Sequence, residues 1–182
     1  MRRLALVLSL AASLTAPAMA TQKDPALDGL FDRLRTVTDP MQARLLIQAI
    51  WETWTASDDS ALDALMARGL RQIQARDLDG AVETFTSLIE KAPDFAEAWN
   101  KRATVQWMRG DYDASVADIQ RTVVLEPRHF GAWSGLGMIL EEREQYDGAA
   151  RAFEECLKHN PHAEGLRDHI EDLKRKAARQ KT

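Results

Sequence analysis

The stretch from residue 133 to residue 161, WSGLGMILEEREQYDGAARAFEECLKHNP, decides the fold of this chain of 182 residues. It contains a tryptophan followed by a Leu-Gly pair, then an alanine four residues before a phenylalanine, and it ends on a proline. The same features occur earlier at a spacing of 34 residues, so that Pro93 and Pro127 precede Pro161, and Trp99 precedes Trp133. A fixed period of this length indicates stacked structural repeats.

Other positions follow the same period, and their residue types suit two packed helices per unit. Small residues allow two helix axes to approach closely, large apolar residues fill the space beside them, and each proline ends a helix. The predicted repeat core consists of Leu65, Gly69, Ala81, Phe85, Pro93, Trp99, Ala103, Tyr112, Ser115, Ile119, Pro127, Trp133, Leu136, Gly137, Tyr146, Ala149, Phe153 and Pro161.

These residues resemble the tetratricopeptide repeat family, whose pattern is Trp-x2-Leu-Gly-x2-Tyr, then Ala-x3-Phe, then Pro. The third unit matches best, and the second departs from the pattern at Arg102 and Gln106, where apolar residues are usual. The first unit is weaker, with Arg68 and Gln72 in place of apolar residues. The resemblance implies an all-α fold, a right-handed solenoid of helical hairpins.

The domain organisation follows from this register. Three units are expected over residues 61–161, at approximately 62–95, 96–129 and 130–163. Residues 21–60 form a helical hairpin that does not fit the repeat and is expected to pack on the first unit, and residues 162–182 form a capping helix with a basic tail. The prediction is about nine helices.

The first 20 residues have the features of a secretory signal peptide. Arg2 and Arg3 precede an apolar run over residues 4–14, and Ala18-Met19-Ala20 offers a cleavage site after Ala20. We therefore expect a periplasmic or secreted protein. No later stretch is long and apolar enough for a transmembrane helix. The formal net charge of −4 argues against a nucleic-acid-binding domain, and the single cysteine excludes an internal disulfide.

In tetratricopeptide proteins, a second face of the first helix of each unit lines a peptide groove. The resemblance implies that the corresponding residues here are Met66, Leu70, Ile73, Asn100, Thr104, Trp107, Met108, Ser134, Met138 and Glu141. This set is rich in methionine and apolar side chains, which suits an adaptable site for an apolar peptide or helix face. The alternative is that the hairpin or the next unit covers these residues. The basic side chains with which some family members clamp a carboxylate pair are absent at Met66, Leu70, Ser134 and Met138.

The sequence thus predicts a non-catalytic adaptor that binds a protein or peptide partner, with no cofactor, no metal and no nucleic acid. One alternative is a structural subunit that docks through its outer surface or associates with itself. Another is a metal-carrying protein, because Cys156, His159, His162 and His169 are close in sequence. Cys156 falls at a repeat position where a small apolar residue packs, which favours a structural role.

Overall fold

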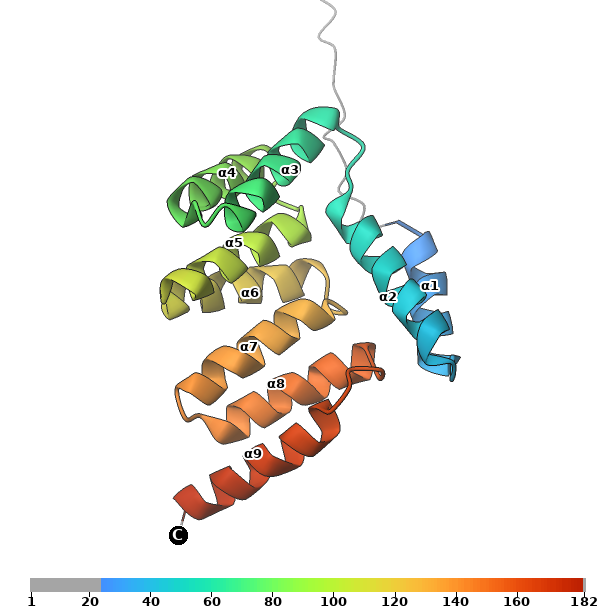
Figure 1. The fold of residues 1–182 in the computed structure, drawn as a ribbon, viewed down its shortest axis with the longest axis vertical. Helices are drawn as coiled ribbons and strands as arrows, with labels where there is room; N and C mark the ends of the chain where they lie inside the picture. Colours follow the sequence, from blue (N-terminus) through green and yellow to red (C-terminus); the bar gives the residue numbers. More distant parts are fainter. Residues whose placement is uncertain (1–23, 182) are drawn as a thin grey trace, which may run out of the picture.

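A computed structural model of the chain describes residues 24–181, and the predicted signal peptide lies outside them (Figure 1). The described residues form nine α-helices and no strand. The helices are α1 (Ala26–Thr36), α2 (Pro40–Thr55), α3 (Ser60–Gln74), α4 (Leu78–Lys91), α5 (Ala96–Arg109), α6 (Tyr112–Leu125), α7 (Phe130–Glu142), α8 (Tyr146–His159) and α9 (Leu166–Gln180). No helix in this part of the chain is both long enough and apolar enough to cross a membrane.

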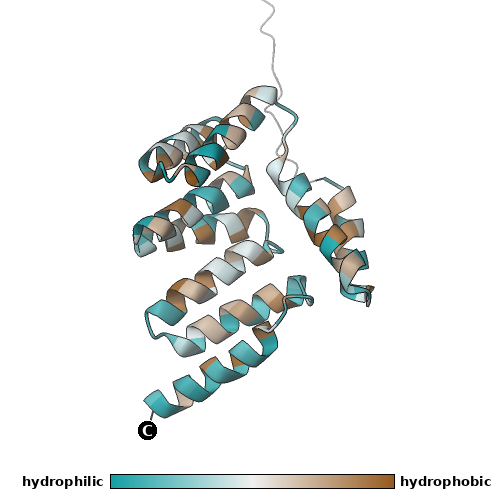
Figure 2. Ribbon diagram, viewed as in Figure 1, coloured by the Kyte–Doolittle hydropathy of each residue, from teal (hydrophilic) through white to brown (hydrophobic). Residues whose placement is uncertain are grey.

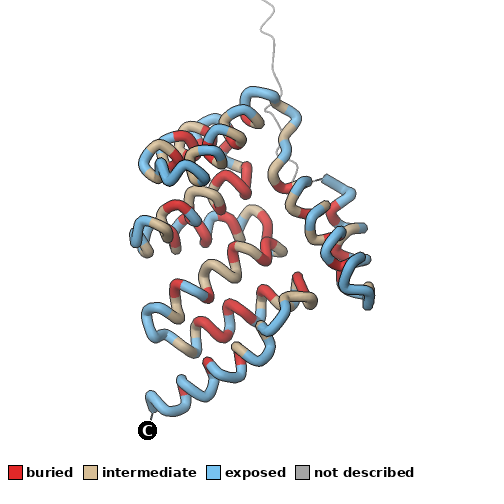
Figure 3. Tube along the Cα trace, in the orientation of Figure 1, coloured by how far each residue is buried: buried red, intermediate tan, exposed pale blue. Residues whose placement is uncertain are grey.

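Helices α3 to α8 stack as three successive pairs, α3 with α4, α5 with α6, and α7 with α8, and α9 packs on α8 (Figure 1). Buried residues concentrate where neighbouring helices meet, whereas the outer side of α9 is exposed along its length (Figure 3). The predicted all-α helical solenoid is therefore confirmed. Helix α9 buries Ile170, Leu173 and Ala177 against the last pair and leaves its charged residues in water, as a cap requires.

Small residues bring the two helices of each pair together. A Cβ atom added at Gly69 would lie 2.4 Å from the Phe85 ring, and one at Gly137 would lie 2.7 Å from the ring of Phe153. In the middle pair, the Ser115 hydroxyl donates a 2.8 Å hydrogen bond to the backbone carbonyl of Ala103. The small residue on the first helix of each pair therefore leaves room for a side chain or backbone contact from the second helix.

The repeated tryptophans and prolines share one interaction. The indole Nε1 of Trp99 donates to the backbone carbonyl of Pro93 at 3.0 Å, and that of Trp133 donates to the carbonyl of Pro127 at 2.9 Å. Each bond joins the start of a unit to the loop that precedes it. Half-buried tryptophans are satisfied in this way because one end of the indole is apolar and the other is a hydrogen-bond donor.

Two of the polar departures from the repeat pattern, Arg102 and Gln72, have partners on a facing helix, whereas the buried Oε1 of Gln106 has no hydrogen-bond partner among the described residues. Arg102 makes a bidentate ion pair with Asp118 on α6, in which Nε and Nη2 donate to the two carboxylate oxygens at 2.7 and 2.8 Å. Arg102 also donates to the hydroxyl of Thr86 on α4. In the first unit, Gln72 accepts a 2.7 Å hydrogen bond from the hydroxyl of Thr84. Hydrogen bonding thus replaces the apolar contact that the pattern would supply.

The N-terminal hairpin does not pack on the first unit, and that expectation was wrong. Helices α1 and α2 lie beside the later units (Figure 1), where Phe31 and Trp54 share one apolar cluster with Phe130 of α7 and Cys156 of α8. The rings of Trp54 and Phe130 are 5.0 Å apart. The hairpin therefore reaches past the first unit and covers the loops that join the second and third units. A broad apolar face on α2 requires this additional surface to bury it.

Candidate functional site

A buried polar cluster fixes the hairpin to the solenoid. The backbone N–H of Ala132 donates to Nδ1 of His129 at 3.0 Å, so that Nε2 carries the hydrogen that is donated to Glu97 at 2.8 Å. The His129 ring is fully buried and stacks on Trp54 of the hairpin, with ring centroids 4.1 Å apart and an interplanar angle of 11°. His129 thus caps α7, holds α5 through Glu97 and supports α2 through stacking.

Glu97 carries a charge inside this cluster. Its carboxylate accepts a 2.9 Å hydrogen bond from Asn100 and lies 2.8 Å from the ammonium group of Lys101. Burial raises the pKa of Glu97, but the charge of Lys101 and the hydrogen bond from His129 outweigh it, and the pKa is lowered below its usual value. The same ammonium group lies over the ring of Trp51, 5.1 Å from its centroid.

Two hollows lie beside the point where the hairpin meets the solenoid. The first, the groove hollow, lies between α5 and α7 and has a volume of about 120 Å³. It is lined by Asn100, Ala103, Thr104, Trp107, Ser115, Ile119, Gly131, Gly135, Met138 and Ile139. Gly131 and Gly135 lie one turn apart on α7 and place no side chain over the hollow, while Met138 at its edge is 41% exposed.

The second hollow, the hairpin cleft, lies between α2 and α3 and has a volume of about 450 Å³. It is lined by Gln48, Trp51, Glu52, Thr55, Ala56, Asp63, Met66, Ala67 and Leu70. The two hollows adjoin at Trp51, which lines the hairpin cleft and whose ring edge would lie 2.5 Å from a Cβ atom added at Gly131 of the groove hollow. Gly131 is therefore required for the close approach of α2 to α7.

The predicted groove residues are divided between these hollows. Asn100, Thr104, Trp107 and Met138 line the groove hollow. Met66 and Leu70 line the hairpin cleft. Met66 is only 2% exposed, so it forms part of the inner surface of the cleft and not of its mouth. The groove is thus neither fully open nor fully covered, because the hairpin closes one end of it and forms a new cleft there.

The other predicted groove residues line neither hollow. Ile73 packs against the core of the first unit, and Met108 and Ser134 are half-buried. The carboxylate of Glu141 accepts a 2.7 Å hydrogen bond from His169 and lies 3.2 Å from the ammonium group of Lys176, so it joins α7 to α9.

Some lining residues are missing from the predicted set, above all Trp51 and Glu52 of α2 and Ala67 of α3. The repeat register could not reveal the α2 residues, because α2 lies outside the repeat and its position depends on contacts far along the chain. The pair Gly131 and Gly135 offered a signal, since two glycines one turn apart on a helix face leave that face open to a close neighbour.

The candidate metal ligands do not come together. Cys156 lies in the apolar cluster under the hairpin, and burial raises the pKa of its thiol to about 11. Nε2 of His162 donates a 2.9 Å hydrogen bond to the backbone carbonyl of Leu34, and His169 hydrogen-bonds to Glu141. Within residues 24–181, no three His, Cys, Asp or Glu side chains are grouped so that they could hold a metal ion.

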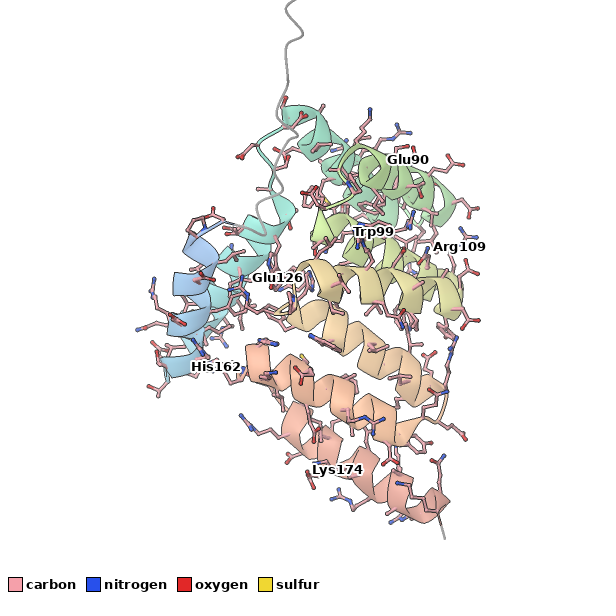
Figure 4. All side chains as sticks on the ribbon, turned by 180° about the vertical axis from the view of Figure 1, so that it is seen from behind. Glu90, Trp99, Arg109, Glu126, His162 and Lys174 are labelled. Atoms are coloured by element: carbon pink, nitrogen blue, oxygen red, sulfur yellow. The ribbon has the colours of Figure 1, made fainter. Side chains whose placement is uncertain are left out.

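His162 lies on the side of the solenoid that faces the hairpin, as does Glu126, whereas Glu90 and Arg109 lie on the opposite side (Figure 4).

Comparison with known proteins identifies the repeats. Residues 66–124 and 102–164 match the family described as Tetratricopeptide repeat. A TPR repeat-containing protein of Rhizobium etli is 31% identical over 156 residues, which cover 86% of this chain and 76% of that protein. The mouse tetratricopeptide repeat protein 36 is 34% identical over 101 residues, which cover 52% of this chain and 53% of the mouse protein.

Solved structures with the same fold include the Sgt2 TPR domain from Aspergillus fumigatus, with a TM-score of 0.62 and 22% identity over 68% of this chain and 83% of that one. The first TPR of Spaghetti (RPAP3), bound to the HSP90 peptide SRMEEVD, has a TM-score of 0.62 and 17% identity, and covers 66% of this chain and 96% of that one. At these identities the likeness concerns the fold alone.

Proposed function

This chain belongs to the tetratricopeptide repeat family, and from that premise we propose that it is a non-catalytic adaptor that binds a peptide or a helix of a partner protein. The binding surface is the concave face of α5 and α7. The role requires binding alone, with no cofactor and no reaction.

The groove hollow is the observation that carries this proposal. Trp107 and Ile139 give it an apolar wall, and Met138 presents a flexible apolar side chain at its edge. Asn100 and Thr104 add polar atoms beside that apolar surface. An apolar hollow with a few polar groups is typical of a site that binds a side chain of a partner and orients its backbone.

Family relatives support peptide binding as the mode of action, since the first TPR of Spaghetti (RPAP3) is bound to the HSP90 peptide SRMEEVD. The ligand of this chain is expected to differ. The acidic character of that peptide calls for basic groove residues, whereas Met66, Leu70, Ser134 and Met138 supply none at the corresponding positions here. An apolar segment suits this groove better.

The partner is proposed to be another envelope or secreted protein. This part of the proposal rests on the signal-peptide features of residues 1–20, with cleavage after Ala20, which would place the protein in the periplasm or outside the cell. Mass measurement of the protein purified from its own cells tests it. A mature chain that begins at Thr21 is expected, and an intact N-terminus in the cytoplasmic fraction would overturn it.

Affinity capture with matched variants tests the binding surface. Met138→Glu and Thr104→Glu place a charge at exposed positions of the groove hollow, while Val124→Glu places one on α6, where the side chain is 68% exposed. We expect the two groove variants to lose a partner that the Val124→Glu variant retains. A charge at Met66 would be a poor test, because that buried side chain supports folding.

A second candidate function is docking through the outer surface, as a structural subunit or by self-association. Met41 and Leu45 favour it, because they lie one turn apart on α2 and are 57% and 60% exposed. Such an exposed apolar pair can serve as a contact for another protein. Loss of partner capture or of self-association in a Leu45→Glu variant, with the groove variants unaffected, would favour this function over the groove.

A further inference from the structure

The hairpin cleft exists because the hairpin docks on the later units. Helix α2 leads directly into α3 through a short connection, but it leans away from α3 toward α7 (Figure 1). The two helices therefore diverge and leave the hairpin cleft of about 450 Å³ between them. Its inner surface is formed by the ring of Trp51 and by Met66, Ala67 and Leu70, so it is mainly apolar.

The mouth of the hairpin cleft is acidic. Glu52 is exposed and accepts a 2.7 Å hydrogen bond from Gln48, but it makes no ion pair with any residue in the described range 24–181. Asp63 accepts hydrogen bonds from the backbone and hydroxyl groups of Ser57, at 2.9 and 2.8 Å, and it too lacks an ion pair within that range. Two carboxylates thus border an apolar surface, and neither forms an ion pair with another described residue.

Another charged pocket of the molecule differs in this respect. Between α1 and α8, Asp28 is paired with Arg128, and Asp32 is paired with Arg35. The charges there are paired with one another, whereas the two carboxylates of the hairpin cleft have no ion-pair partner among the described residues. Unpaired carboxylates beside a low-dielectric surface attract cations more strongly than paired ones.

We propose that the hairpin cleft anchors a basic amphipathic segment of the partner protein. Such a segment inserts a large apolar side chain between Trp51 and Leu70, and places a Lys or Arg within one helical turn of it, beside Glu52 and Asp63. This inference rests on the proposed adaptor function and adds a second contact to it, at the end of the groove that the hairpin closes. A helix laid along α3 reaches the hairpin cleft with one face and presents its flanking charges to the acidic mouth.

Two synthetic peptides test the charge preference. Both carry the same stripe of leucines on one helical face, with lysine flanks in one and glutamate flanks in the other. Fluorescence anisotropy of the labelled peptides is measured against the protein purified from cells that express the full chain. The lysine peptide is expected to bind about tenfold or more tightly than the glutamate peptide at low salt, with the difference shrinking as salt is added.

Variants locate the binding. Glu52→Lys reverses an exposed charge at the mouth and should weaken the lysine peptide about tenfold. Glu90→Lys makes the same change on α4, on the far side of the molecule from the hairpin (Figure 4), and should leave binding unchanged. Ala67→Trp fills the hairpin cleft and should weaken the lysine peptide in a protein whose helix content by circular dichroism is unchanged.

The outcomes separate this inference from the adaptor function. If Met138→Glu abolishes binding of the lysine peptide while Glu52→Lys and Ala67→Trp leave it intact, the adaptor stands and the proposed anchor is overturned. Equal affinity for the two peptides, or no binding of either, also overturns it. A dimer that is lost in the Glu52→Lys variant, without peptide binding, would show that a second copy of the chain occupies the hairpin cleft instead.

Discussion

At the scale of single residues, the turn inside each helix pair uses a left-handed backbone conformation at the same repeat position. Arg76, Gly110 and Glu144 have φ angles of 61°, 82° and 55°. Glycine adopts this conformation without steric cost, whereas a side chain at such a position brings Cβ close to the following carbonyl oxygen. Only the middle unit therefore has the residue that this turn favours.

We expect opposite effects from two exchanges at this position. Gly110→Glu should lower the free energy of unfolding by about 1–2 kcal/mol, because it imposes the left-handed conformation on a side chain. Glu144→Gly should raise it by about 0.5 kcal/mol, since relief of that cost exceeds the added freedom of the unfolded chain. Urea unfolding measures both. Changes of the same sign would show that the turns differ in some other respect.

Single residues also show where a sequence pattern is informative. The small residue Gly69 could be predicted as a point of close helix contact, because its role depends on a neighbour within the same unit, Phe85. The pairing of Arg102 with Asp118 could not, since the pattern says only that an apolar residue is missing. A polar residue in a core position predicts that a partner exists, but not which facing residue it is.

At the scale of elements, Glu97 joins α5 to α7 through His129 and is held in its charged form. A carboxyl group with a lowered pKa in the folded state stabilises that state at pH values above its usual pKa. The stabilisation is lost as the pH falls below the usual value of 4.5 and through the lowered value, because the folded state then binds the proton less readily than the unfolded chain.

Replacement of Glu97 by glutamine should change this dependence. At neutral pH, Glu97→Gln should lower the free energy of unfolding by about 1–3 kcal/mol, because hydrogen bonds to a buried charge are lost. As the pH falls below 4.5, the difference between wild type and variant should shrink. Urea unfolding across this range measures it.

Asp147→Asn serves as the control, since Lys181 also lowers the pKa of Asp147 but the group is exposed. Its effect should be much smaller, because solvent screens an exposed ion pair. A gap between wild type and the Glu97→Gln variant that does not depend on pH would show that the charge of Glu97 does not stabilise the fold.

The helices themselves were largely predictable, because each depends on local signals. Asp39 accepts a hydrogen bond from the N–H of Met41 and is followed by Pro40, so the start of α2 can be recognised from the sequence. The docking of α1 and α2 was not predictable, since it depends on Phe130 and His129, far along the chain. The hairpin cleft could not be foreseen for the same reason.

At the scale of the whole molecule, the apolar interior is divided. The first unit shares a cluster, which includes Phe85 and Leu88, with α5, while the hairpin shares a separate cluster with Phe130 and Cys156. Apolar residues occur on the stacked helices and on α2, whereas α9 is mostly hydrophilic (Figure 2). Because stacked repeats gain stability from contacts between neighbouring elements, we expect the hairpin to separate from the solenoid without unfolding the first unit.

The thiol of Cys156 reports on this separation, because it is 4% exposed and its raised pKa of about 11 keeps it protonated and slow to react. Trp54→Ala removes the ring that stacks on His129, and should raise the rate of thiol labelling in native buffer about 100-fold, as loosening of the hairpin exposes Cys156. Leu88→Ala creates a cavity in the other cluster and should leave the rate much closer to that of wild type. Mass spectrometry of the labelled protein follows both rates. Equal acceleration by the two variants would mean that Cys156 is exposed only by global unfolding, and that hairpin and solenoid behave as one cooperative unit.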